Sequence, residues 1–354
     1  MLRYRGKKIQ QTVKDLDSFA INKINKTYVK QTPLGGAVTI LISIFVLWII
    51  IAETLYFLDT DFVFTFVPDA DFDDKLKINL DITIAMPCHS LGADIIDSTN
   101  QNMILFGELQ EEETWFELDP AQKNYFDSMR HVNSYLTEEF HAVQNLLWKS
   151  RFVSTFTEIP KRRSKPSEPP DACRIHGSLT LNKVAGNLHV TAGKSLALPG
   201  GHIHLTMFGL GAASNFSHRI DRFSFGDPSP GIIHPLESEL RVTDQEQMLY
   251  QYFIDVVPTD VDTLFSSLRT YQYSAKELSR LIDHEVGSHG MSGIFFKYNT
   301  NALKVIVRET RDPFIEFFIR LSGVLGGVYI VTGILKNFLD NCTQKTATKS
   351  PGSS

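Results

Sequence analysis

Two long apolar segments frame the chain. Residues 34–58 hold one formal charge, Glu53, and residues 314–335 hold Glu316 and Arg320 near their start and no charge after that. At 1.5 Å per residue, either segment is long enough to cross the hydrocarbon core of a bilayer as a helix. We predict membrane-spanning helices at 34–58 and 313–337, with a buried helix of a soluble protein as the alternative for each. The first segment is not expected to be a signal peptide, because it starts too far from the N-terminus and lacks a small-residue cleavage site.

Between these segments the pattern changes to alternation. Residues 75–86 place Leu, Ile or Met at every second position, and the alternation recurs at Leu303, Val305 and Val307. Short runs rich in Val, Ile, Tyr and Phe lie at 202–208, 250–257 and 293–298, between clusters of Gly, Pro, Asn and Asp. A period of two is typical of strands with one buried face, and many short strands favour a sandwich. We therefore predict an all-β domain, a β-sandwich, at 59–312.

One helix is expected within this domain. Asp119 and Pro120 give an N-cap and a first-turn proline. Apolar residues then follow at spacings of three or four, which predicts one amphipathic helix packed on the sheets: Phe126, Met129, Val132, Leu136, Phe140, Val143 and Leu147. Residues 159–172 contain four prolines and several basic residues, and are expected to form an exposed connection.

The distribution of charge predicts the orientation. Residues 1–33 carry eight Lys/Arg and two Asp, and the C-terminal tail is also net positive, whereas 59–312 carry 23 Lys/Arg and 35 Asp/Glu. By the positive-inside rule, the tails 1–33 and 338–354 face the cytosol and the acidic domain lies in a lumen. The formal net charge of −5 also lacks the basic excess of a nucleic-acid-binding protein.

A luminal domain would meet oxidising conditions. Cys88 and Cys173 are its only cysteines, and we predict that they form a disulfide, with two separate buried thiols as the alternative. Cys342, on the cytosolic side, is expected to stay reduced, and its palmitoylation is left open. Asn215 begins the one luminal Asn-X-Ser/Thr sequence, at 215–217, and is a candidate for N-glycosylation.

The sequence contains no clear catalytic, metal or cofactor site. Ser288 and His289 are neighbours without a nucleophile-elbow spacing, and His202 and His204 share a strand face but lack a third metal ligand. All eleven histidines nevertheless lie between the two apolar segments, where acidity changes along a secretory pathway. The candidate pH sensors are His176, His189, His202, His204, His218, His284 and His289, although exclusion of histidine from the spans would give the same distribution.

The two predicted spans carry features of their own. Glu53 and Arg320 fall at similar depths and are candidates for an interhelical ion pair; the alternative pairs Arg320 with Glu316 on the same helix. Small residues give the second helix a face for close packing against the first span or a partner helix: Ser322, Gly323, Gly326 and Gly327.

Eight short motifs are spread along nearly the whole chain. They lie at 16–19 (Leu-Asp-Ser-Phe), 78–83 (Ile-Asn-Leu-Asp-Ile-Thr), 173–177 (Cys-Arg-Ile-His-Gly), 182–187 (Asn-Lys-Val-Ala-Gly-Asn), 215–220 (Asn-Phe-Ser-His-Arg-Ile), 223–226 (Phe-Ser-Phe-Gly), 287–293 (Gly-Ser-His-Gly-Met-Ser-Gly) and 323–327 (Gly-Val-Leu-Gly-Gly). With these motifs in this order along its length, the chain resembles the endoplasmic reticulum–Golgi intermediate compartment family of vesicle-cycling cargo receptors. It resembles the second member of that family more than the cysteine-richer partner.

The resemblance implies a non-enzymatic protein that pairs with a related subunit and cycles between endoplasmic reticulum and early Golgi in coated vesicles. It also implies binding of luminal cargo, favoured on the acidic Golgi side, and contact with coat proteins through the tails. The C-terminal tail departs from the expected pattern because it lacks a Lys-Lys retrieval signal; Phe338 and Leu339 are its one candidate export pair.

Two other function classes remain open at this stage. A two-span ion channel with a large ectodomain would use Glu53 and Arg320 in its pore. A luminal enzyme would require at least one of His202, His204, Ser288 and His289.

Overall fold

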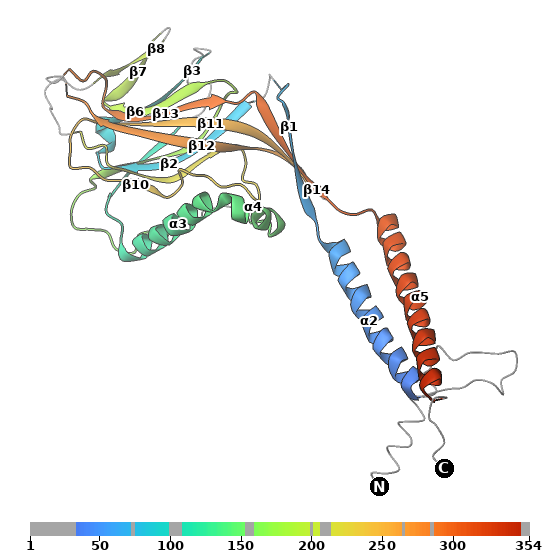
Figure 1. The fold of residues 1–354 in the computed structure, drawn as a ribbon. Helices are drawn as coiled ribbons and strands as arrows, with labels where there is room; N and C mark the ends of the chain where they lie inside the picture. The colour runs from blue at the N-terminus through green and yellow to red at the C-terminus, as the bar shows by residue number, and fades with distance from the viewer. Residues whose placement is uncertain are drawn as a thin grey trace, which may run out of the picture. The chain divides into compact units, whose positions relative to one another are not determined.

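The computed structural model describes residues 33–71, 75–98, 108–152, 159–198, 201–205, 214–263, 266–283 and 287–347. The chain divides into two compact units (Figure 1). The β unit is Phe62–Glu309, and the helical unit combines Met1–Asp61 with Thr310–Ser354. The motif at 16–19 and His284 lie outside the described residues.

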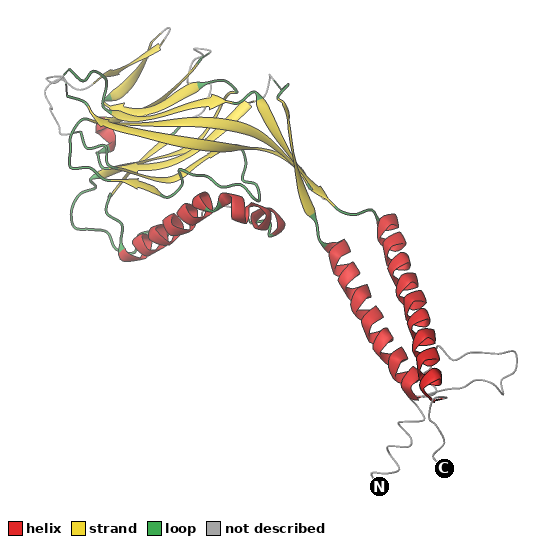
Figure 2. Cartoon of the chain, in the orientation of Figure 1, coloured by secondary structure: helices red, strands yellow, loops and turns green. Residues whose placement is uncertain are grey.

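The β unit is built on two sheets (Figure 2). The larger sheet has the order β1-β14-β11-β13-β6-β3, with β12 on the other side of β11. Its strands are β1 (Asp61–Pro68), β3 (Leu91–Asp97), β6 (Gly186–Ala192), β11 (Met248–Asp262), β12 (Ser267–Leu281), β13 (Gly293–Thr300) and β14 (Leu303–Thr310). Strands β13 and β14 follow one another along β11 and both pair with it in parallel, so this sheet is mixed.

The smaller sheet has five strands in the order β10-β9-β2-β5-β4, and all its pairs are antiparallel. They are β2 (Lys75–Ile84), β4 (Gln110–Thr114), β5 (Ala172–Asn182), β9 (His218–Phe225) and β10 (Glu239–Arg241). A separate hairpin joins β7 (Lys194–Leu198) to β8 (Gly201–Leu205).

The core lies between the two sheets, as alternation in the sequence requires. Leu76, Ile78 and Ile82 of β2 are at most 1% exposed, and they belong to the same buried cluster as Tyr252 and Phe296 of the larger sheet. Phe296 stacks on Tyr252 with ring centroids 5.1 Å apart. Such aromatic pairs add about 0.5–1.5 kcal/mol to their burial. The predicted all-β sandwich is confirmed.

The predicted helix is present but is broken into two pieces. Helix α3 (Pro120–Glu138) begins with a capping box at Asp119, as expected, and α4 (Phe140–Lys149) follows after a non-helical Glu139. Of the predicted apolar face, Val132 is 39% exposed, and a polar residue, Asn133, is buried in its place. The Asn133 amide donates to the carbonyls of His234 and Glu237, at 3.1 and 2.7 Å, and so attaches α3 to the loop that follows β9.

The motif at 182–187 has a structural role. In the turn at 182–187, Lys183 pairs with Asp69 at 2.6 Å. A Cβ atom on Gly186 would lie 2.2 Å from the Tyr298 hydroxyl, so no larger residue fits there without a shift. Lys183 and Gly186 therefore stabilise the turn that connects the two sheets, and this role accounts for the motif without any catalytic function.

The helical unit contains α2 (Pro33–Leu58) and α5 (Phe314–Ala347). Each includes a stretch long and apolar enough to cross a membrane, at Gly35–Leu58 and Phe314–Lys336. Arg320 Nε donates to Glu53 Oε2 at 2.9 Å and Nη2 to Asp312 Oδ2 at 3.0 Å, while its guanidinium carbon lies 4.6 Å from the Tyr56 ring centroid. The arrangement is therefore the interhelical pair, and not the alternative pair with Glu316.

The small residues of α5 are not used to pack it against α2. Cβ atoms placed on Gly323, Gly326 and Gly327 would meet nothing within 4 Å, and Ser322 donates to a carbonyl of its own helix. Helix α5 continues to Ala347, so Phe338, which is 64% exposed, lies within the helix. The side chains of Leu339 and Cys342 lie outside the described part of the chain.

Candidate functional site

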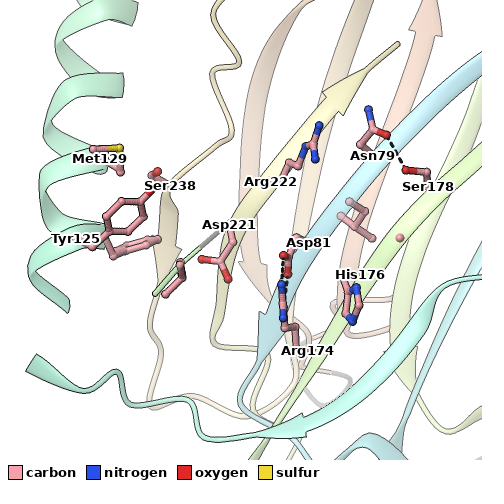
Figure 3. Close-up of a pocket in the computed structure, with 14 residues that line it drawn as sticks. Asn79, Asp81, Tyr125, Met129, Arg174, His176, Ser178, Asp221, Arg222 and Ser238 are labelled. Atoms are coloured by element: carbon pink, nitrogen blue, oxygen red, sulfur yellow. Dashed lines mark hydrogen bonds and ion pairs between the residues drawn. The ribbon is translucent and has the colours of Figure 1, made fainter. Parts of the chain in front are cut away.

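The outer face of the five-stranded sheet carries rows of polar side chains. Asp81 of β2 lies between Arg222 of β9 and His176 of β5, which are its partners on the two neighbouring strands (Figure 3). In the next row, Thr83 lies between Arg219 and Arg174. These positions alternate with the buried Leu and Ile residues of β2, so the strand that builds the core also builds this polar face.

A β-bulge places two charged residues of β9 together on this face. The pairing of β9 with β2 runs from Asp81↔Arg222 to Ile82↔Ile220, which leaves Asp221 as the extra residue. A bulge bends its strand and redirects side chains, and bulges are frequent beside functional sites. Ile220 and Phe223 on either side are fully buried, while Asp221 and Arg222 both line the same cavity.

Two ion pairs fix the floor of this face. Arg174 donates Nε and Nη2 to the two carboxylate oxygens of Asp81, at 2.9 and 2.6 Å. Arg219 does the same to Asp221, at 2.7 and 3.1 Å. Hydrogen bonding to Asp81 raises the pKa of Arg174, and burial raises the pKa of Asp221 against the lowering effect of Arg219. Bidentate pairs hold both groups in fixed geometry, so the floor is preorganised.

Helix α3 and the connection after it turn this face into a groove. A cavity of about 190 Å³ lies between the sheet and Tyr125, Phe126 and Met129 of α3 (Figure 3). A second cavity of about 600 Å³ continues from it beneath residues 159–170 and shares Asp81, Arg174 and Asp221 with the first. We call the two cavities together the sheet groove. Six basic and four acidic side chains line it, although 59–312 as a whole is acidic.

A disulfide ties together the chain segments that carry the groove walls. Cys88 and Cys173 are bonded, with their Cα atoms 4.8 Å apart and 85 positions apart in the sequence. The loop that they close contains β3, β4, α3, α4 and the connection at 159–171. A cluster formed by these cysteines and Glu111 has the composition of a metal site, but both thiols are consumed in the disulfide.

The described histidines occupy very different environments. His176 lines the sheet groove. His218 is fully buried, with Nδ1 2.9 Å from the Phe216 carbonyl and Nε2 2.8 Å from the Tyr252 hydroxyl, and burial lowers its pKa to about 4. That pKa lies below the range of a switch between mildly acidic compartments, so His218 is a core residue and we remove it from the candidate sensors.

The other candidates whose side chains the structure describes lie outside the groove. His189 is 5% exposed and stacks on Phe295 of the larger sheet. Ser288 and His289 lie in the segment after β12, where the Ser288 hydroxyl and the His289 carbonyl both accept from Arg280. The side chains of His202 and His204 lie outside the described residues. Asn215 is half-buried, and its side-chain oxygen accepts from the Ser217 amide at 2.9 Å.

The groove is not evident from the apolar pattern of the sequence, because that pattern marks only the core-facing half of each alternating strand. The polar half held a signal. In β2 the intervening positions include Asn79 and Asp81, residue types that strands generally disfavour, and Arg174 and His176 alternate in the same way in β5. Such residues on a predicted strand indicate that the polar face of the sheet has a function other than contact with solvent.

Comparison with known proteins identifies the family of this chain. A family model described as endoplasmic reticulum vesicle transporter matches residues 156–336, and one described as Endoplasmic Reticulum-Golgi Intermediate Compartment (ERGIC) matches residues 13–104. Endoplasmic reticulum-Golgi intermediate compartment protein 2 of Homo sapiens is 42% identical over 335 residues, which cover 95% of this chain and 88% of that protein. ER-derived vesicles protein ERV41 of Saccharomyces cerevisiae is 29% identical, covering 88% of this chain and 87% of that protein.

A crystal structure of Erv41p is 24% identical in sequence, with a TM-score of 0.45, and covers 69% of this chain and 99% of that one. The resemblance noted in the sequence is confirmed by the two family models and the relative at 42% identity. The chain therefore belongs to the endoplasmic reticulum–Golgi intermediate compartment family, as a membrane protein of the vesicle traffic between these organelles.

Proposed function

We propose that this protein is a non-enzymatic cargo receptor subunit whose sheet groove binds cargo in the lumen. Its helices α2 and α5 cross the membrane, and both tails face the cytosol, where they contact vesicle coat proteins. The observation that carries the proposal is the preorganised groove: fixed ion pairs on its floor, and walls from α3 and the 159–171 connection. Membership of a vesicle-protein family supports the cellular setting.

The chemistry of the groove favours binding over catalysis. Asp81 and Asp221 each accept two hydrogen bonds from an arginine, so the oxygens of both carboxylates are already engaged within the protein. A rigid polar floor with an apolar wall is typical of a recognition site. Capture and release then depend on affinity that differs between compartments.

His176 is the described candidate best placed to supply that difference. It lies in the groove beside Asp81, opposite Gln110 of β4, with Arg174 on its own strand and Arg222 beyond Asp81. Histidine as a residue type gains positive charge in the more acidic compartments of the secretory pathway. We therefore propose that anionic cargo binds more tightly there.

The helical unit offers a place for a related subunit. The open small-residue face of α5, at Gly323, Gly326 and Gly327, would let a partner helix approach closely. We propose a hetero-oligomer formed partly through this face. The ion-channel alternative requires Glu53 and Arg320 to line a pore. Their hydrogen bond to one another disfavours this alternative, because each group is then occupied by the other.

Photocrosslinking in sealed microsomes tests the receptor proposal. A photoreactive residue at Met129, in the groove wall, should form adducts with luminal proteins, and more at pH 6 than at pH 7. The same residue at Met291, which is 55% exposed and lies outside the groove, is the matched control. Equal adducts from both positions would contradict the groove as the cargo site.

Protease protection tests the topology on which the proposal depends. A protease added to sealed microsomes should remove the tails and spare the β unit. Digestion of the β unit with sparing of both ends would refute a luminal groove.

A further inference from the structure

Of the three arginines that β5 and β9 contribute to the sheet groove, Arg222 is the one without an ion-pair partner among the described residues. We infer that Arg222 binds the carboxylate of an Asp or Glu side chain in an extended cargo segment, while the α3 wall holds an apolar side chain next to it. This inference rests on the proposed function, because it specifies the ligand of the same groove.

Arg222 differs from its two arginine neighbours. Arg174 and Arg219 are each bound by a carboxylate in bidentate geometry, at distances of 2.6–3.1 Å. Arg222 is exposed, lines the same cavity, and has no hydrogen-bond or ion-pair partner among the residues that the structure describes. Its five N–H donors are therefore available to a ligand.

The buried carboxyl of Glu237 does not cancel the charge of Arg222. Glu237 precedes Ser238 of the groove, is 3% exposed, and interacts electrostatically with Arg222. Burial raises the pKa of Glu237 to about 8, so it is mainly neutral in neutral and mildly acidic solution. Arg222 consequently presents a full positive charge to the groove under these conditions.

The other groups of the groove restrict what can bind. Asp81 and Asp221 are already satisfied by Arg174 and Arg219, so a basic ligand would find no free carboxylate at this end of the groove. Met129 and the ring of Tyr125 offer apolar surface on the facing wall (Figure 3). The continuity of the two cavities fits a length of extended chain better than a compact small molecule.

A degenerate peptide array tests this assignment. Heptapeptides with a fixed central residue (Glu, Asp, Gln, Asn or Lys), random residues elsewhere, and acetyl and amide caps are probed with the full-length protein in detergent. The protein should bind the Glu and Asp pools about tenfold more strongly than the Gln and Asn pools, since hydrogen bonds to a charged group are worth roughly that much. The Lys pool should bind most weakly.

Two variants make the test specific. Arg222→Gln should abolish the preference for Glu over Gln. Lys276→Gln removes the same charge from β12, outside the groove, and should leave the preference unchanged. A Gln pool with a free C-terminus distinguishes a terminal carboxylate from a side-chain carboxylate, and selective binding of that pool alone would refute the inference.

The remaining outcomes separate the inference from the proposed function. No preference for Glu in the unmodified protein, or a preference that survives Arg222→Gln, would overturn the role of Arg222 even if crosslinks at Met129 still identified cargo. A preference that depends on Arg222, together with no cargo at Met129 in microsomes, would support the ligand class and overturn the receptor role.

Discussion

Removal of the Cys88–Cys173 disulfide should be the most informative single perturbation of the β unit. The bond closes a loop of 85 positions. In the chain-entropy model, a loop of that length contributes about 4.6 kcal/mol through restriction of the unfolded state. For a domain the size of the β unit, 1 kcal/mol shifts Tm by roughly 2–4 °C. The double variant Cys88→Ala, Cys173→Ala should therefore unfold roughly 9–18 °C below the unmodified protein.

The assay is thermal unfolding of the full chain in detergent, followed by intrinsic fluorescence. Unmodified protein treated with a thiol reductant should shift to nearly the same Tm, which separates loss of the bond from loss of packing around the buried sulfurs. Because the loop carries α3, binding in the sheet groove should weaken as well. A Tm within about 3 °C of the unmodified value, in both the variant and the reduced protein, would refute the reasoning.

Three further perturbations have defined outcomes. Arg320→Gln should lower the amount of protease-protected protein in microsomes because Glu53 loses its partner, and adding Glu53→Gln should restore part of it; no recovery would contradict the pairing. Burial, with Arg222 nearby, lowers the pKa of His234 to about 4, so stability should fall as pH drops from about 6.5 toward 4. His234→Phe should flatten that fall in denaturant titrations, and an unchanged slope would exclude this histidine as its source. Gly186→Ala should cost about 1–3 kcal/mol through overpacking, measured as a lower Tm that Tyr298→Phe partly restores by removing the hydroxyl.

Much of the architecture follows from local patterns. The alternation at 75–86 predicts β2 (Lys75–Ile84) with its correct buried face, because a half-buried strand needs one apolar side only. The capping residues at Asp119 and Pro120 predict the start of α3 for a similarly local reason. The two apolar helices are evident from length and composition alone.

The features that local sequence patterns do not predict depend on contacts between distant segments of the chain. Strand β12 (Ser267–Leu281) is exposed over its second half, so no apolar alternation marks it, and its pairing with β11 defines it. The break at Glu139 interrupts a continuous apolar pattern, and α3 is attached to the loop after β9 by the buried amide of Asn133. The orientation of Arg222 depends on a bulge that only the pairing of β9 with β2 reveals.

The bulge at Asp221 also limits how the protein can evolve. Deleting Asp221 would restore regular pairing and would leave Phe223 and Phe225 facing the core, because each would keep its present partner on β2. The Arg219 side chain, which is only 7% exposed, would lose the carboxylate that accepts its two hydrogen bonds and would be left as an uncompensated charge. Changes of ligand preference in this lineage should therefore arise by exchange of side chains along β9, and insertions or deletions within that strand should be rejected by selection.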